Sequence, residues 1–144
     1  MHKLKPEYIV GLTDGEGSFT VYIRNPYSNK DRKRRVVAEP KFYIKFIEKD
    51  KKILYELKKY FGCGKVYFQK DSRPNHKNCY RYEVIRRKDL EKIIIPFFQK
   101  YKLKLPSKKK DFNLFCKIFK RIQKGEHLNK NKLKILYKIK QNMH

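Results

Sequence analysis

Acidic residues are scarce in this chain of 144 residues. Asp and Glu number 14 against 39 Lys and Arg, which gives a formal net charge of +25. A charge of this size attracts polyanions, so the composition predicts nucleic acid as the first partner and an anionic membrane surface as a weaker second. The length suits one domain, residues 1–144, and hardly allows two.

Long apolar runs and paired cysteines are also missing. The longest apolar run, Ile93–Phe98, contains Pro and is far shorter than the roughly 20 residues of a membrane-spanning helix, so no membrane insertion is expected. The first six residues lack the apolar stretch of a secretory signal. Cys63, Cys79 and Cys116 form no Cys-x-x-Cys pair, and the four His are scattered, which argues against structural zinc. An odd number of cysteines favours reduced thiols in an intracellular compartment.

The chain can nevertheless bury a core, because 40% of its residues are hydrophobic and 15% are aromatic. Apolar periodicity and turn residues predict helices and strands in alternation. The expected elements are a helix over 6–14, strands over 18–25 and 36–47, a helix over 50–61, strands over 65–70 and 79–86, a helix from about Asp89 that is interrupted at Pro96, and helices over 110–123 and 130–141. This order predicts an α+β fold in which helices cover one face of four antiparallel strands.

The opposite face of the predicted sheet is polar and basic. In residues 18–25, Phe19, Val21 and Ile23 alternate with polar side chains, so one face is buried and the other is wet. The outward strand residues are Ser18, Thr20, Tyr22, Arg24, Lys41, Tyr43, Lys45, Tyr67, Gln69, Arg81 and Glu83, and the loops near them add Lys30, Arg32, Lys33, Arg34, Arg35, Lys70, Arg73 and Lys77.

Such a face is ordinarily only solvated, but here its composition favours DNA binding. Cationic side chains alone are enough to bind phosphates, because they neutralise the phosphate charge and release counterions. The mixture of Arg, Lys, Gln and Glu also matches donors and acceptors on base edges in the major groove, which a β-ribbon fits. The face therefore predicts sequence-specific binding to double-stranded DNA.

The first predicted helix ends in two acids, Asp14 and Glu16. Gly11 and Gly15 lie four residues apart on one helix face, and each costs about 1 kcal/mol relative to Ala. Close approach of a second helix would explain them; a helix C-cap at Gly15 is the alternative. Glycines on both sides of Glu16 let the backbone approach a ligand, and a carboxylate beside a cationic surface suits Mg²⁺ held against a phosphate. By spacing alone, Asp14 and Glu16 are better explained as turn residues than as metal ligands.

The segment Ile9–Phe19 resembles the LAGLIDADG motif with its trailing Ser-Phe, although Val10 and Thr13 replace the commoner Ala and Ile. Later segments resemble the remaining parts of LAGLIDADG homing endonucleases in the same order: Phe42–Asp50, Leu57–Val66, Tyr80–Val84 followed by Lys88–Leu90, and Lys108–Phe112 before Phe115. The resemblance covers essentially the whole chain. It implies the αββαββα fold, with a saddle-shaped antiparallel sheet and C-terminal helices.

The resemblance also implies a function. It implies a homing endonuclease that cuts a long, nearly palindromic DNA site with Mg²⁺ or another divalent ion. One motif per chain implies a homodimer whose motif helices meet through Val10, Gly11, Asp14 and Gly15. The implied catalytic residues are Glu16, Glu48 and Lys108, with Glu16 and the Gly15 carbonyl as metal ligands. Asp14 is expected to be structural rather than catalytic, and Glu48 also fits a helix N-terminal acid.

Other functions remain open at this point. An intron-RNA maturase or a catalytically silent DNA-binding protein would keep the same fold, with intron RNA as a partner in the first case. Tyr8–Gly11 lacks the Gly-Ile-Tyr that precedes it in GIY-YIG nucleases, and the ExK spacing of Glu56–Lys58 falls on a predicted helix. A basic ribosomal protein would leave the Gly-Glu-Gly ending unexplained. The family's association with mobile introns implies an intracellular location: the mitochondrion or chloroplast of a lower eukaryote, or a microbial cytoplasm.

Overall fold

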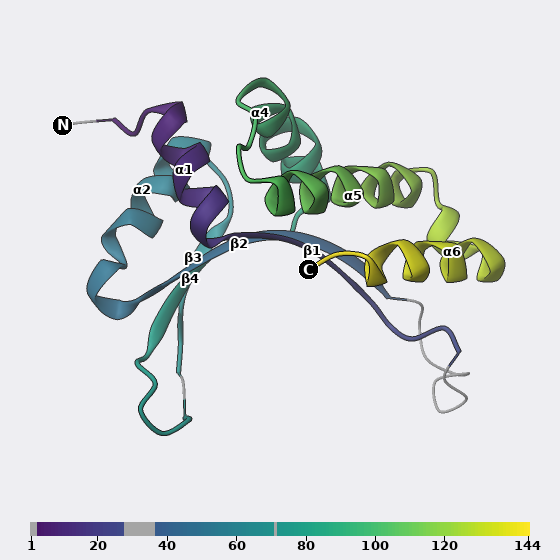
Figure 1. Ribbon diagram of the computed structural model, residues 1–144, viewed down its shortest axis with the longest axis horizontal. Coiled ribbons are helices and arrows are strands. Elements are labelled where there is room, and N and C mark those ends of the chain that lie inside the picture. Colours follow the sequence, from purple (N-terminus) through teal and green to yellow (C-terminus); the bar gives the residue numbers. More distant parts are fainter. Residues whose placement is uncertain (1–2, 28–36, 71) are drawn as a thin grey trace. The chain divides into compact units, whose positions relative to one another are not determined.

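The computed structural model describes residues 3–27, 37–70 and 72–144. They group into two compact units, the first from residues 1–18 and 41–105 and the second from residues 19–40 and 106–144. The strands are β1 (Gly17–Ile23), β2 (Ala38–Ile47), β3 (Lys65–Gln69) and β4 (Cys79–Val84), and they form one antiparallel sheet in the order β1-β2-β4-β3 (Figure 1). The predicted α+β fold is confirmed. Lys30, Arg32, Lys33, Arg34 and Arg35 lie outside the described residues.

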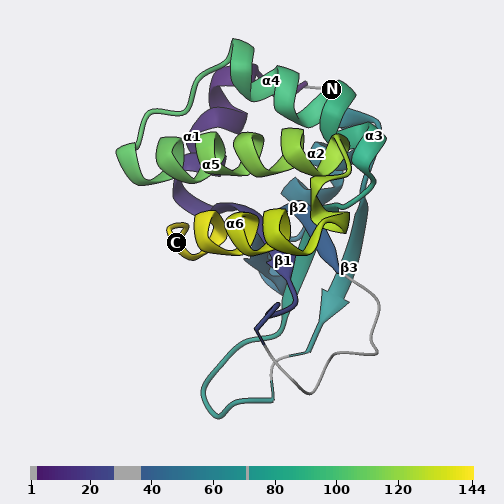
Figure 2. The ribbon, with the colours of Figure 1, turned by 90° about the vertical axis from the view of Figure 1, so that its right-hand side faces the viewer.

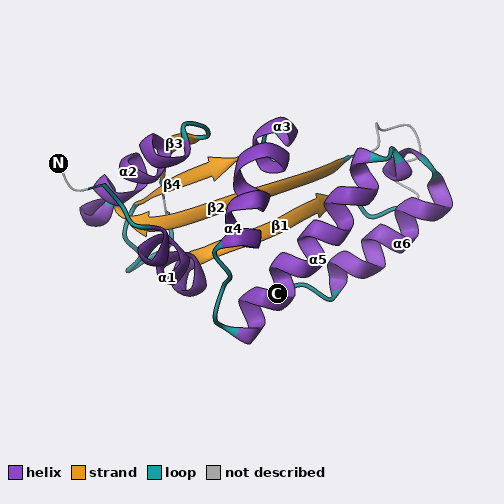
Figure 3. Cartoon of the chain, turned by 90° about the horizontal axis from the view of Figure 1, so that it is seen from above, coloured by secondary structure: helices purple, strands orange, loops and turns teal. Residues whose placement is uncertain are grey.

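The first unit places its helices on one face of β2, β4 and β3 (Figure 3). These elements are α1 (Pro6–Glu16), the 3₁₀ turn η2 (Glu48–Asp50), α2 (Lys52–Phe61), α3 (Arg87–Asp89), the π-helix η3 (Leu90–Ile94) and α4 (Ile95–Lys100). Phe42, Ile44 and Tyr82 are fully buried beneath them, together with Leu54 and Leu57 of α2. The predicted alternation of buried and outward residues along β2 and β4 is therefore confirmed.

The second unit pairs α5 (Pro106–Gln123) with α6 (Lys130–Gln141), which lie side by side (Figure 2); the 3₁₀ turn η4 (Glu126–Leu128) connects them. Phe19 of β1 packs against Phe112 and Phe115 of α5, with ring centroids 5.0 and 5.6 Å apart. The side chain of Asn129 accepts hydrogen bonds from the backbone N–H groups of residues 131 and 132, which caps the start of α6. The predicted bounds of this last helix are confirmed.

Helix α1 runs to Glu16, two residues beyond its predicted end, and a C-cap at Gly15 is wrong. The capping residue is Gly17, whose backbone is extended (φ −80°). A Cβ at Gly17 would lie 2.6 Å from Cγ2 of Thr13, so glycine is needed here for close packing against the last turn of the helix. Thr13 is fully buried, and its hydroxyl donates a hydrogen bond to the carbonyl oxygen of Ile9 at 2.8 Å, so this buried hydroxyl has a partner.

Pro96 does not interrupt its helix, which corrects the sequence-based expectation. Residues 87–100 stay helical throughout, and the turn before Pro96 is a π-helix in which the N–H of Ile95 bonds the carbonyl of Leu90. The wider turn and the position of Pro96 in the first turn of α4 accommodate the missing N–H. Helix α5 likewise begins at Pro106 rather than at residue 110, because Pro suits the first helical position.

The three cysteines are free, as expected for reduced thiols. Burial raises the pKa of Cys116 to about 12. Burial also raises the pKa of Cys63, the strongest of several influences on that thiol. Both side chains are therefore protonated at neutral pH and poorly nucleophilic. No helix in the described part of the chain is long and apolar enough to cross a membrane.

Replacing Gly64 with Ala is expected to destabilise the protein strongly. Gly64 has φ +86°, and an added Cβ would lie 2.7 Å from Cε1 of Tyr82 and 2.9 Å from the carbonyl oxygen of Glu83. The left-handed backbone alone costs about 1 kcal/mol or more, and the clash adds to it. Gly62→Ala is the matched control, because Gly62 also has φ +69° but a Cβ there would meet nothing within 4 Å. Urea unfolding should show the larger loss for Gly64→Ala; equal losses would contradict the packing argument.

Candidate functional site

The last turn of α1 presents an acid to solvent in a chain dominated by cations. Glu16 is the final residue of the helix, and its side chain is exposed. No basic residue lies in this last turn. The C-terminal end of a helix carries the negative end of its dipole and leaves backbone carbonyls, including that of Gly15, without helical partners. Glu16 and the end of α1 therefore form a local negative site within the first unit.

Asp14 anchors the segment that precedes α5 to the end of α1. Its carboxylate accepts hydrogen bonds from the backbone N–H of Lys104 at 2.9 and 3.1 Å and from that of Leu105 at 3.2 Å. The side chain is buried, so these amides replace water as its partners. The expectation that Asp14 is structural agrees with this geometry. The position of Glu16, two residues later, depends on the same turn of helix.

Glu16 lines an open surface depression, which we call the Glu16 depression. The other residues that line it are Tyr43, Lys45, Phe46, Ile47 and Cys79. The residues from β2 and β4 belong to the middle and one end of β2 and to the start of β4. The depression brings a carboxylate and an ammonium group together on one accessible surface. Such a pair can hold a divalent ion and a phosphate group next to each other.

The strand register places the predicted polar side chains on one face of the first unit. Tyr43 lies opposite Glu83 and Lys45 opposite Arg81 on β2 and β4, while Tyr67 lies opposite Arg81 on β3 and β4. Residues paired in this way point to the same side of a sheet. We call this surface the polar face; its members are Lys41, Tyr43, Lys45, Lys65, Tyr67, Gln69, Cys79, Arg81 and Glu83. The predicted outward residues of β2, β3 and β4 are therefore all brought together.

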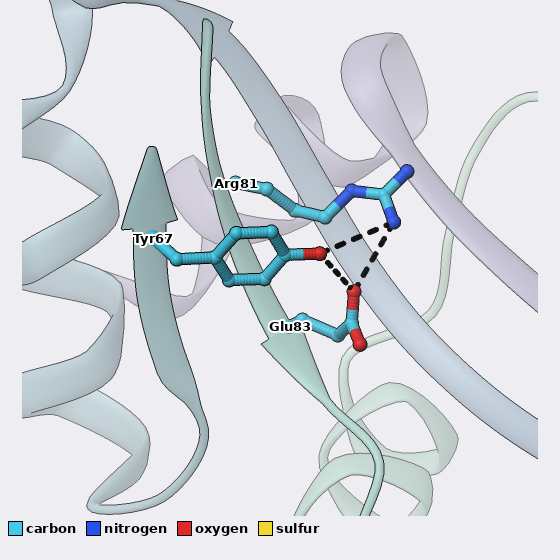
Figure 4. Close-up of polar contacts among 3 residues, drawn as sticks. All are labelled: Tyr67, Arg81 and Glu83. Carbon is cyan, nitrogen blue, oxygen red and sulfur yellow. Dashed lines mark hydrogen bonds and ion pairs between the residues drawn. The ribbon is translucent and has the colours of Figure 1, made fainter. Parts of the chain in front are cut away.

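Three of these residues form a hydrogen-bonded triangle (Figure 4). The hydroxyl of Tyr67 donates to Oε2 of Glu83 at 2.7 Å, and Nη1 of Arg81 donates to the same oxygen at 3.1 Å and to the hydroxyl oxygen of Tyr67 at 3.4 Å. Burial and the hydrogen bond to Glu83 raise the pKa of Tyr67, so its hydroxyl stays protonated. Burial opposes the charge of Arg81, but the bonds to Tyr67 and Glu83 outweigh it and raise the pKa of the guanidinium.

The remaining predicted DNA-binding residues belong to other segments of the chain. Thr20 and Tyr22 of β1 point away from the buried Phe19, Val21 and Ile23 in the second unit, as expected. Ser18 is half-buried at the start of β1, and Arg24 follows the strand, with its backbone N–H bonded to the carbonyl of residue 37 at 3.3 Å. The side chains exposed around the turn from β3 to β4 are Lys70, Arg73 and Lys77.

Glu48, another predicted catalytic residue, does not line the Glu16 depression. Glu48 is exposed at the start of η2 and lines a second depression with Lys49, Lys70, His76 and Lys77. Its place at the start of a helical turn fits the alternative of a helix N-terminal acid. Lys108 is half-buried in the first turn of α5, in the second unit.

Helix α1 has one exposed face. Gly11, Gly15 and Tyr8 are exposed there, and a Cβ added to either glycine would meet nothing within 4 Å. Val10 and Asp14 are buried, with 5% and 8% of their surface exposed, so the structure corrects their placement in a shared dimer surface. Their side chains already pack within the first unit. The exposed small residues leave room for another backbone to approach α1 closely.

The sequence did not predict several features of this site. The guanidinium of Arg81 lies over the ring of Tyr43, with its carbon 3.7 Å from the ring centroid. Lys65 lies on the polar face opposite Glu83, and Ile47 and Cys79 line the Glu16 depression. Alternation along β3 and the pairing of β2 with β4 could have indicated these positions once the register was known. The bonds of Asp14 to residues 104 and 105 have no sequence signal, because their partners are backbone amides ninety residues away.

Comparisons with known proteins match most of the chain to one family. A family model described as LAGLIDADG endonuclease matches residues 9–119. A curated protein named probable intron-encoded endonuclease 3, from Neurospora crassa, is 32% identical over 142 residues, which are 98% of this chain and 25% of that protein. The chain spans only about a quarter of the length of this relative and of a second N. crassa endonuclease, of which it covers 27%.

Two solved structures have a fold similar to that of this chain. The crystal structure of the homing endonuclease I-TnaI is similar with a TM-score of 0.81 and 36% identity, over 99% of this chain and 90% of that one. The LAGLIDADG homing endonuclease I-GzeII, solved in complex with its DNA target, gives a TM-score of 0.81 and 32% identity over 100% of this chain and 45% of that one.

Removing the carboxylate of Asp14 is expected to destabilise the first unit. Asp14→Ala leaves two backbone N–H groups without their acceptor, which should lower the free energy of unfolding by about 1–3 kcal/mol. Glu7→Ala is the control, because it removes an exposed acid from the first turn of the same helix and should cost less than about 1 kcal/mol. Denaturant unfolding of the two variants measures the difference. Equal, small losses would show that the buried hydrogen bonds contribute little.

Proposed function

The chain belongs to the LAGLIDADG endonuclease family, and from this premise we propose that it is a sequence-specific endonuclease that cuts both strands of DNA. The observation that carries the proposal is the position of Glu16: an exposed carboxylate at the end of α1, next to Lys45 and Tyr43 in an open depression. The polar face supplies cations for phosphates and mixed hydrogen-bonding groups for bases. The complexes of relatives such as I-GzeII with DNA support this reading of the face.

We propose Mg²⁺ or another divalent ion as the cofactor, with Glu16 and the carbonyl of Gly15 as its protein ligands. The donor set fits: Mg²⁺ is usually held by one or two carboxylates together with substrate phosphates and water. The described ranges contain no group of three or more His, Cys, Asp or Glu that could hold a metal ion by themselves, so the protein ligands would have to be completed from outside one chain. Bound there, the ion would supply an activated water and charge stabilisation at the cleaved phosphate.

The chain's own residues have distinct tasks in this proposal. Glu16 supplies negative charge that holds the metal, and Asp14 fixes the end of the helix that carries it. Lys45 lies beside Glu16 and binds a phosphate near the cleaved bond. Lys108 neutralises negative charge that develops during cleavage. Glu48 keeps a supporting role at the second depression, where it orders solvent or places its negative charge at the start of η2.

We further propose that two copies of this chain act together as a homodimer. Each chain carries one motif helix, and the exposed face of α1 with Gly11 and Gly15 gives a second helix room to pack closely. A twofold dimer repeats the same surface, so its DNA site is long and nearly palindromic. The chain covers 45% of the length of I-GzeII, which is consistent with two such units per working enzyme.

The setting proposed for this activity is an intracellular one, with a gene carried by an intron, as the names of the fungal relatives indicate for those proteins. The organelle or microbial cytoplasm that houses the protein is part of the same proposal. Intron RNA stays the alternative partner: a chain that binds intron RNA and never nicks DNA would be a maturase of the same fold.

Glu16→Gln tests the proposed catalytic role. The substitution keeps the size of the side chain and removes its charge, so DNA cleavage should fall more than about 100-fold, since even the hydrogen-bond partners of metal ligands are worth 10- to 100-fold. Binding of the target, measured by fluorescence polarisation, should change little. Lys58→Gln on the exposed side of α2 is the control and should cleave like the parent protein. Full cleavage by Glu16→Gln would exclude this residue as the metal ligand.

Gly11→Leu tests the homodimer. A side chain at Gly11 meets nothing within 4 Å in its own chain, so the fold should be as stable as before or slightly more stable, because Gly weakens a helix by about 1 kcal/mol. Analytical ultracentrifugation should show a shift from dimer towards monomer, and cleavage should fall in parallel. Lys58→Leu adds the same side chain to an exposed position of α2 and should leave the assembly unchanged. An intact Gly11→Leu dimer would place the contact elsewhere.

A further inference from the structure

We infer that Arg81 reads a guanine in the major groove, and that Glu83, Tyr67 and Tyr43 are positioning residues that hold its guanidinium for this purpose. The inference rests on the proposed binding of double-stranded DNA to the polar face. It deepens that proposal by separating one base-reading residue from the many phosphate-binding cations around it.

The guanidinium is fixed before DNA arrives. Both hydrogen bonds of Arg81 use Nη1, with Glu83 and Tyr67 as acceptors (Figure 4). The guanidinium carbon also lies 3.7 Å from the ring centroid of Tyr43. Only 18% of the Arg81 side-chain surface and 12% of that of Glu83 are exposed. A free arginine loses rotamer freedom when it binds, whereas a held arginine has lost that freedom on folding. Such a rigid group suits recognition of a base edge, which requires a fixed orientation, better than binding of a phosphate, which requires only positive charge.

The charge balance points the same way. Arg81 is paired with the carboxylate of Glu83 at 3.1 Å, so the pair is nearly neutral towards a distant phosphate. Lys45, its neighbour across the register, makes no ion pair within the described residues, so no carboxylate is bonded to its ammonium group. Phosphate binding requires unpaired cations and gains nothing from an adjacent carboxylate. Glu83 on a DNA-binding surface is therefore explained by orientation of Arg81 and not by affinity for the backbone.

The unused donors of Arg81 fit a guanine. Within the described residues, both bonds of Arg81 use Nη1, and Nη2 makes no hydrogen bond. The two N–H groups of Nη2 are therefore left for another partner, whereas Nε is buried and cannot reach a base. Guanine presents two acceptors, O6 and N7, on its major-groove edge, and arginine is their most frequent partner. Adenine and cytosine place a donor on this edge, and thymine offers the single acceptor O4 next to a methyl group, so guanine alone presents two acceptors and no donor.

The position of this contact follows from Tyr43. The same ring lies under Arg81 and lines the Glu16 depression, so the base-reading group and the metal-binding acid share a neighbour in the first unit. The guanine read by Arg81 therefore belongs to the base pairs close to the cleaved phosphates and not to the outer ends of the site. Symmetry of a dimer would require one such guanine in each half-site.

The test separates base reading from phosphate binding in one set of measurements. The target is first selected from a random duplex library with the parent protein in Ca²⁺, and affinity for every single-base variant of that target is then measured across a series of salt concentrations. Arg81→Met should lose the preference for guanine at one position per half-site by roughly 10- to 100-fold. The slope of log affinity against log salt should stay nearly constant, because a neutral pair releases few counterions.

Matched variants give the contrast. Lys45→Met should lower that slope by about 0.9 for each phosphate that the ammonium group no longer neutralises, and it should leave the base preferences intact. Glu83→Gln should weaken the guanine preference several-fold while making the salt dependence steeper, since Arg81 is then free to bind a phosphate. Tyr67→Phe should weaken the preference less, because it removes one acceptor and keeps the ion pair.

Two results would overturn the inference. A fall of about 0.9 in the salt slope for Arg81→Met with unchanged base preferences would make Arg81 a phosphate contact. No change in either quantity would make the triangle purely structural. Arg81→Lys serves if the Met variant does not fold: it keeps the charge and loses the planar fork, so the guanine preference should still fall. If the parent protein selects no sequence from the library, the proposed function itself fails, which is a separate outcome.

Discussion

The carboxylate of Asp14 holds the candidate site in place. It is buried, and its three hydrogen bonds to the amides of Lys104 and Leu105 fix the end of α1 to the segment that leads into α5. Glu16 follows two residues later on the solvent side of the same turn. Asp14 thus stabilises the fold, and Glu16 remains exposed to solvent at the end of the same helix.

The scarcity of acids gives each one a defined environment. Glu83 lies on the polar face paired with Arg81, and Asp111 is buried with its carboxylate oxygen 3.0 Å from Nδ1 of His144 in the second unit. Among the acids of α1, Glu7 lies in the first turn, where it favours the helix dipole. Glu16 differs from all of these, because it is exposed at the negative end of a helix and beside a lysine. This contrast is the reason for proposing Glu16 as a ligand for an added cation.

The sequence predicted the elements well and their contacts poorly. Alternation in β1 placed Phe19 and Val21 inside and Thr20 outside, because a half-buried strand must alternate. The predicted interruption at Pro96 was wrong, because the sequence does not reveal that a π-helical turn will accommodate the missing N–H. Val10 and Asp14 were assigned to a dimer contact by resemblance, yet spacing alone does not say which side of α1 faces the core. The stacking of Arg81 on Tyr43 needed the strand register, which depends on tertiary pairing.

The open glycine face of α1 has a consequence for folding. Gly11 and Gly15 weaken the helix they belong to, since each gives up packing and adds freedom to the unfolded chain. If two chains meet on this face as proposed, association supplies the packing that the glycines omit, and the pairing of the two Glu16 carboxylates becomes linked to protein concentration by mass action. Dilution would then separate the subunits while the hydrogen bonds of Asp14 keep each helix end in place, so that an isolated chain brings one Glu16 alone to a wrong site.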